Sequence, residues 1–161
     1  MKISKDKKLC EEYIGKHPVI SISLKGINAA SYEAAFELTV KTLKGAVQKA
    51  GFLKMSDKLD EDEKKEYRAI LDENMSEATL FWSLKNLSEL LEKHYETKVI
   101  LLIDEYDVPI AKASSHQYYP QMLEILKVMM STALKDNPGL CFAVVTGCLQ
   151  IAKESIFTGL N

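Results

Sequence analysis

A chain of 161 residues predicts about one domain, since roughly 150 residues is a common domain length. The apolar fraction of 47% is sufficient for a hydrophobic core, and the net charge of −2 shows no basic excess of the kind that marks nucleic-acid binding. The start MKISKDKKLC lacks the apolar segment of a secretion signal, and we expect no membrane span. Three cysteines without metal-ligand spacing favour a reducing, cytoplasmic setting.

The first 51 residues predict a helix, a strand and a second helix. A short helix over about residues 4–14 has Ser4 as its expected N-cap and Leu9, Tyr13 and Ile14 as its apolar contacts. The strand covers 18–24, because alternating isoleucines lie between Pro18 and Gly26. Ser31 is the expected N-cap of a longer helix that ends near Gly51. Its apolar residues recur every three or four positions: Tyr32, Phe36, Val40, Leu43, Val47 and Ala50.

The middle of the chain predicts one charged segment and one strongly amphipathic helix. The sequence KMSDKLDEDEKKE, residues 54–66, is dense in both signs of charge, so we expect a solvated helix or loop with little core. Ser76 then caps a helix with a leucine stripe at Leu80, Leu84, Leu87 and Leu91.

That helix leads into the most informative stretch of the chain, VILLIDEYDVPI at residues 99–110. An uncharged run of branched residues suits a strand buried on both faces, as in a parallel sheet covered by helices. The run ends in Asp104 and Glu105, and Pro109 stops further strand pairing. Because side chains alternate along a strand, the two carboxylates should point to different sides if the extended conformation continues to Glu105.

The last part of the chain predicts a buried helix and a third strand. Residues 118–135 form a helix that is apolar on most sides, through Met122, Leu126, Met129 and other residues. The strand at 140–145 follows, and it ends at Thr146 and Gly147.

Strands that alternate with helices predict an α/β fold with a three-layer parallel sheet and flanking helices. We expect the strand order 18–24, 99–103, 140–145, with Asp104 on the central strand. Ligands bind beyond the carboxyl ends of the strands in such sheets, and these ends carry Lys25-Gly26, Asp104-Glu105 and Thr146-Gly147. We therefore predict a magnesium and phosphate site there.

The sequence VILLIDEYDVPI resembles the Walker B strand of P-loop NTPases of the type that includes AAA proteins. The longer pattern, which continues through ALKDNP to FAVVTGCLQIAKESIFTGLN, resembles the bacterial AAA-ATPase-like family, whose members often carry a PD-(D/E)xK nuclease-like domain further along. The resemblance extends over nearly the whole chain and is most specific from 99 to 161. It implies a P-loop NTPase-like fold and an ATPase that uses ATP with Mg²⁺.

The resemblance also implies roles for individual residues. Asp104 would coordinate Mg²⁺ indirectly, Glu105 would be the base that activates water, and Thr146 would be the polar sensor of the γ-phosphate. Gln150 stands where the family commonly has an arginine, which predicts weaker neutralisation of phosphate charge. The family's closing motif includes Lys153, Glu154 and Ser155, and the resemblance implies no particular chemistry for them.

A phosphate-binding P-loop is absent from these residues. It requires the pattern G-x-x-x-x-G-K-[ST], whereas the one Gly-Lys pair, Gly15-Lys16, is followed by His17, and Cys10 occupies the place of the earlier glycine. The family places this motif ahead of the segment with which the chain begins. We therefore interpret residues 1–161 as a partial ATPase core that lacks the first strand and the P-loop, and that is inactive by itself.

Two other classes of function remain open. The first is a non-catalytic interaction or regulatory domain that keeps a degenerate NTPase fold. The second is a metal-dependent nuclease that uses Asp104 or Glu105, for which the only candidate second half is Glu63-Lys64-Lys65, in the charged segment. A nucleic-acid partner is not identified by the sequence. The edge of the 140–145 strand should be open, and we expect it to pair with a second copy or to be covered by another segment.

Overall fold

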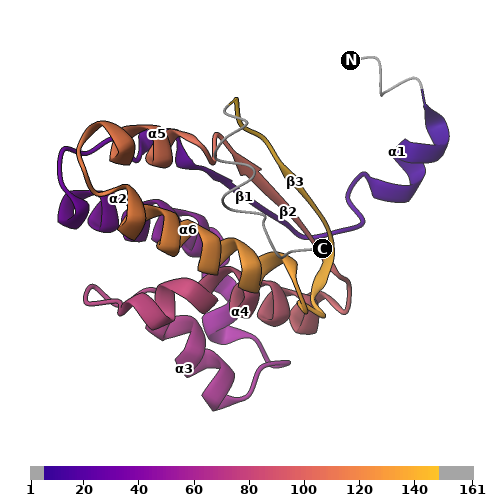
Figure 1. The fold of residues 1–161 in the computed structure, drawn as a ribbon. Coiled ribbons are helices and arrows are strands. Elements are labelled where there is room, and N and C mark those ends of the chain that lie inside the picture. Colours follow the sequence, from indigo (N-terminus) through magenta and orange to yellow (C-terminus); the bar gives the residue numbers. More distant parts are fainter. Residues whose placement is uncertain (1–5, 149–161) are drawn as a thin grey trace.

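The computed structural model describes residues 6–148, which form a three-stranded sheet and six α-helices (Figure 1). In chain order the elements are α1 (Lys7–Tyr13), β1 (Val19–Ser23), the 3-10 turn η2 (Leu24–Gly26), α2 (Tyr32–Gln48), the 3-10 turn η3 (Gly51–Met55), α3 (Glu61–Ile70), α4 (Glu77–Tyr95), β2 (Val99–Asp104), α5 (Val108–Ser115), α6 (Tyr119–Leu134) and β3 (Leu140–Val145). The α/β fold class is therefore confirmed.

The three strands are parallel and lie in the order β1, β2, β3. This confirms the predicted order, with Asp104 at the end of the central strand. The register pairs Ser23 with Asp104, and it pairs Ile103 with Val145. All three strands thus end at nearly the same level, and the segments that follow them meet at one edge of the sheet.

The described residues build two layers rather than the three that we predicted. Helices α2, α4, α5 and α6 lie on one side of the sheet (Figure 1), where they bury Ile20, Ile22 and Leu101. On the other side Val19 is 53% exposed and Val144 is 45% exposed. The prediction overestimated coverage because it extended the apolar character of β2 to its neighbours, whereas β1 buries only every second residue.

The predicted helix starts at Ser31 and Ser76 are both confirmed. The Ser31 hydroxyl accepts the N–H of Ala34 at 3.3 Å, and the Ser76 hydroxyl accepts the N–H of Thr79 at 3.1 Å. Each hydroxyl satisfies one of the N–H groups that lack a partner in the first turn of a helix. The 17-residue α2 and 19-residue α4 then pack their apolar stripes against the sheet and α6.

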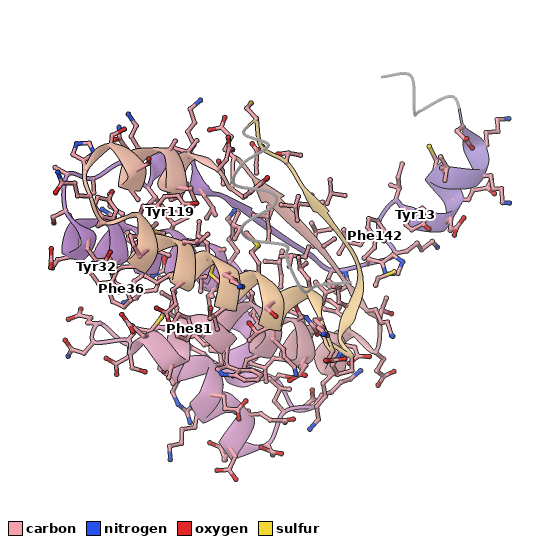
Figure 2. All side chains as sticks on the ribbon, viewed as in Figure 1. Tyr13, Tyr32, Phe36, Phe81, Tyr119 and Phe142 are labelled. Atoms are coloured by element: carbon pink, nitrogen blue, oxygen red, sulfur yellow. The ribbon has the colours of Figure 1, made fainter. Side chains whose placement is uncertain are left out.

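Helix α1 differs from the prediction in its cap and in its contacts. Ser4 lies outside the described residues, and Asp6 caps the helix by accepting the N–H of Leu9 at 3.1 Å. Leu9 is 40% exposed and Ile14 is 70% exposed, so they do not form the expected apolar contacts. Tyr13 does contact the sheet, since its ring and that of Phe142 lie in an edge-to-face arrangement with 5.7 Å between centroids (Figure 2).

The charged segment at 54–66 contributes more to the core than its composition predicts. Helix α3 begins there with a reciprocal capping box, in which Asp60 accepts the N–H of Glu63 and Glu63 accepts the N–H of Asp60. Beneath its charged surface, Leu59 is 3% exposed and Tyr67 is fully buried with its hydroxyl on the carbonyl of Val47. Burial raises the pKa of Tyr67, so this hydroxyl remains a donor at neutral pH.

Helix α5 was not predicted, because Pro109 was interpreted as a residue that stops strand pairing. Pro109 instead lies in the first turn of α5. N–H groups in the first turn have no acceptor within the helix, so the absence of an N–H in proline breaks no hydrogen bond there, and its fixed φ suits the helix. Helix α6 agrees with the prediction and buries Met122, Leu126 and Met129. None of the helices in residues 6–148 is long and apolar enough to cross a membrane.

Candidate functional site

The candidate site lies where the segments after the three strands meet. Lys25 comes from η2 after β1, residues 104–107 end and follow β2, and residues 146–148 follow β3. Two backbone hydrogen bonds join the last two segments: the N–H of Thr146 donates to the carbonyl of Ile103 at 2.8 Å, and the N–H of Tyr106 donates to the carbonyl of Thr146 at 3.2 Å. The positions of their side chains are consequently fixed by the sheet.

The structure brings Asp104 and Thr146 together. The Thr146 hydroxyl donates a hydrogen bond to Oδ1 of Asp104. Both residues are exposed at the carboxyl edge of the sheet, so a ligand can reach them from solvent. This contact follows from parallel pairing of β2 and β3, and it supplies two neighbouring oxygen atoms that face outward.

Glu105 turns away from this pair. Its φ of 53° is in the left-handed region, which costs a non-glycine residue roughly 1–2 kcal/mol. The strand thus ends at Asp104, and the extended conformation does not continue to Glu105, as simple alternation of the two side chains would require. The two carboxylates nevertheless face opposite neighbours, because Oε1 of Glu105 lies 3.8 Å from Nζ of Lys25, on the β1 side.

Lys25 lies at the sheet edge where the sequence placed it, directly after the first strand, and the structure adds its contact with Glu105. Its side chain is 77% exposed and that of Glu105 is 34% exposed. An exposed ion pair of this kind is worth at most about 1 kcal/mol. Lys25 can therefore hold Glu105 near β1 when the site is empty and release it at little cost.

Asp107 is a residue that the sequence reasoning missed, and it bonds to the segment that carries Thr146. Its side chain is buried, with 5% exposed, and its Oδ2 accepts the N–H of Cys148 at 3.0 Å. A Cβ atom on Gly147 would lie 2.6 Å from Oδ1 of Asp107 and 2.6 Å from the ring of Tyr106. Only glycine allows this approach without displacement, so the pair Asp107 and Gly147 positions the Thr146 hydroxyl.

Tyr106 packs under the same segment. Burial raises the pKa of Tyr106, and the neighbouring charge of Asp107 raises it further. The phenol stays neutral at physiological pH and adds no charge beneath the site. The negative charge is thus carried by Asp104, Glu105 and Asp107, with Lys25 at the β1 side.

The donor set suits a hard cation. Asp104 and Thr146 offer a carboxylate and a hydroxyl, which are oxygen ligands of the kind that Mg²⁺ accepts. Within residues 6–148 no three His, Cys, Asp or Glu side chains are grouped to hold a metal ion. A cation here would keep waters or ligand phosphates in its shell, which is the usual coordination of Mg²⁺.

A comparison with protein families identifies the chain. A family model described as a predicted AAA-ATPase matches residues 2–157, which is nearly the whole sequence. The chain belongs to the AAA-ATPase-like family. No curated protein and no solved structure matches it. The match confirms the resemblance stated from the sequence, and the matched span of this AAA-ATPase-like chain includes the β2 strand and the segments that follow β2 and β3.

The remaining predicted residues of the AAA-ATPase-like chain are of two kinds, those outside the described part of the chain and those on α3. Gln150, Lys153, Glu154 and Ser155 lie outside the described residues. Glu63 and Lys64 belong to α3, which packs on α4 and η3, and Glu63 accepts a hydrogen bond from Lys93 at 2.5 Å. The second half of a nuclease constellation is thus absent from the neighbourhood of Asp104 in residues 6–148.

Proposed function

We propose that residues 1–161 supply the Walker B part of an ATPase that hydrolyses ATP with Mg²⁺ once a P-loop completes the site. The observation that carries the proposal is the hydrogen bond from Thr146 to Asp104 at the ends of two neighbouring parallel strands, with Glu105 directly after Asp104. The residues that we propose as cation ligand, polar sensor and base thus lie at the sheet edge where α/β proteins bind ligands.

Asp104 and Thr146 would hold Mg²⁺ and the γ-phosphate of ATP. The ion, when bound, neutralises phosphate charge that two carboxylates would otherwise repel. The Thr146 hydroxyl can turn from Asp104 to a phosphate oxygen, since a hydroxyl both donates and accepts. Asp107 and Gly147 keep that hydroxyl within reach of the same position.

Glu105 would act as the general base. Its carboxylate takes a proton from the attacking water as the water oxygen bonds to the γ-phosphorus, and the bond from that phosphorus to the leaving oxygen breaks. To do so Glu105 must leave Lys25, and the exposed 3.8 Å ion pair opposes this movement only weakly. Lys25 then remains at the β1 side as a positive charge near the phosphates.

The 161-residue chain is expected to bind ATP poorly when it is tested alone. Without the amide groups and lysine of a P-loop, the carboxylates repel the triphosphate, and Mg²⁺ bridging gives weak affinity at most. Calorimetry of this chain with Mg-ATP should show no saturable binding at micromolar nucleotide and no turnover above background. Tight binding that disappears in Asp104→Asn would contradict the partial-core proposal.

We also propose that the outer edge of β3, which has no partner strand in residues 6–148, pairs with a second copy or with another segment. Phe142 is 38% exposed and Cys141 is exposed on this strand, and an open hollow of about 890 Å³ follows its edge beside Leu134 and Pro138. Unpaired apolar strand edges favour association. Sedimentation should therefore show a dimer or larger species that a lysine at the 45% exposed Val144 weakens (Val144→Lys). A monomer with exchange-labile β3 amides would contradict this proposal.

A further inference from the structure

The outer edge of β1 borders a small hollow that the ATPase proposal does not use. The hollow has a volume of about 140 Å³ and lies between β1, the end of α2 and α4. Its lining includes the aliphatic side chains of Ala50, Leu87 and Leu91, with Phe52 and Tyr95 at the rim. Phe52 is 41% exposed and Tyr95 is 49% exposed, so the entrance is apolar and open to solvent.

The backbone of β1 presents hydrogen-bonding groups beside this hollow. The N–H of Ile100 donates to the carbonyl of Pro18 at 2.9 Å, and β1 pairs in parallel with β2. Alternate residues of a parallel strand bond to the neighbour, so Ile20 and Ile22 face β2, while Val19 and Ser21 direct their N–H and C=O groups outward. In the described part of the chain no partner bonds to these outward groups of Val19 and Ser21.

The size of the hollow matches one side chain. An apolar protein cavity of about 150 Å³ admits a benzene-sized group, and this hollow is close to that volume. A strand added beside β1 would direct every second side chain toward the helix layer, at the level of the hollow. One leucine or phenylalanine of such a strand would fill it.

The positive charge of Lys49 beside the hollow favours an acidic residue in the added strand. Lys49 is exposed at the lining and makes no ion pair with the described residues, and no acidic side chain contributes to the lining. A carboxylate next to the apolar side chain of an added strand would meet an unpaired cation. This favours a peptide that combines one apolar anchor with an acidic residue.

A second copy of the chain does not fit this edge. If two copies paired through their β1 edges, the hollow of each copy would have to be filled by Ile20 and Ile22 of the other. These are the β1 residues whose side chains face the helices. Both are 4% exposed in their own core and cannot reach a neighbour. Twofold symmetry would also bring the positively charged Lys49 of both copies to the same interface.

We propose that the β1 edge binds an extended, acidic peptide segment of a partner protein by strand addition. The outward groups of Val19 and Ser21 would bond to the peptide backbone, the hollow would take a leucine or aromatic side chain, and Lys49 would pair with its acidic neighbour. Main-chain bonds give such complexes affinity, and pockets for alternate side chains give them specificity. This surface shares no residue with Asp104, Glu105 or Thr146.

The test is selection of random 12-residue peptides, displayed on phage, against the 161-residue chain. We expect enrichment of peptides that carry an apolar anchor and an acidic residue. In fluorescence anisotropy, Ser21→Pro should weaken the selected peptides at least tenfold, because it removes an outward N–H without removing a bond to β2. Ser21→Ala keeps that N–H and should bind like the original chain.

Two further measurements do not depend on the proline variant. Lys49→Glu should weaken binding at least fivefold, whereas Lys41→Glu, elsewhere on α2, should not. The N–H groups of alternate peptide residues point toward β1, and those of the residues between them point away. N-methylation of the first set should abolish binding, and N-methylation of the second set should not. Failure to enrich any peptide, or equal binding to the Lys49→Glu and original chains with no N-methylation pattern, would overturn the proposal.

Discussion

Replacing Glu105 by glutamine in the complete ATPase should leave nucleotide binding intact and slow hydrolysis by about 10²–10⁴-fold, the usual contribution of a general base. Glutamine keeps the shape of the side chain and loses the proton acceptor, so binding and turnover should separate. The measurement is ATP turnover at saturating Mg-ATP, with nucleotide affinity determined in parallel on the same protein.

Glu96 provides a matched control for this substitution. It is an exposed glutamate with a left-handed φ of 56°, and it pairs with Lys58 as Glu105 pairs with Lys25. Glu96→Gln removes a charge and an ion pair, as Glu105→Gln does, from a residue with the same backbone conformation that lies away from the site. It should hydrolyse ATP at the original rate. Equal turnover by the Glu105→Gln variant and the original protein would exclude Glu105 as the base.

Asp104→Asn should produce a different defect. Asparagine keeps one oxygen that can accept from Thr146 but lacks the charge that favours Mg²⁺. The Mg²⁺ concentration needed for half-maximal turnover should therefore rise, which the Glu105→Gln variant should not show. A shift in Glu105→Gln and not in Asp104→Asn would reverse the two assigned roles.

The part of the site on β2 and β3 could be predicted because parallel strands impose it. The apolar run before Asp104 and the second one before Thr146 each predict a strand, and parallel pairing then brings the two strand ends together. No information beyond period, length and strand direction is needed for this contact. The sheet order and the capped helices at Ser31 and Ser76 follow from equally local signals.

The sequence places Lys25 at the β1 side of the site, but the contact of Lys25 with Glu105 could not be predicted, because it depends on one backbone conformation. A non-glycine residue rarely adopts positive φ, and nothing around Glu105 in the sequence marks it. That conformation directs the Glu105 side chain to Lys25. The second face of the sheet differs from the prediction in the described residues for a related reason: exposed Phe142 and Val144 look like core residues in sequence, although the helices in residues 6–148 leave their face open.

The role of Asp107 leads to the second large expected effect. Asp107→Ala should lower the free energy of unfolding of this chain by about 1.5–3 kcal/mol, the range for hydrogen bonds that involve a charged group. The Cys148 N–H would lose its bond to the buried carboxylate. Urea unfolding measures the loss, and faster hydrogen exchange at Thr146 and Cys148 would locate it in the segment after β3. Asp107→Asn keeps an acceptor oxygen and should lose clearly less.

The effects of substituting Gly147 and Asp107 on the free energy of unfolding should not be additive, whereas a general loss of packing would give additive effects. Gly147→Ala places a methyl group against Oδ1 of Asp107 and the Tyr106 ring, and such overpacking costs about 1–3 kcal/mol. In the double variant with Asp107→Ala, one of these two clashes is gone. The combined loss should therefore be smaller than the sum of the single losses by at least about 0.5 kcal/mol. Strict additivity, or single variants as stable as the original chain, would show that the close approach of Gly147 to Asp107 does not hold Thr146 in place.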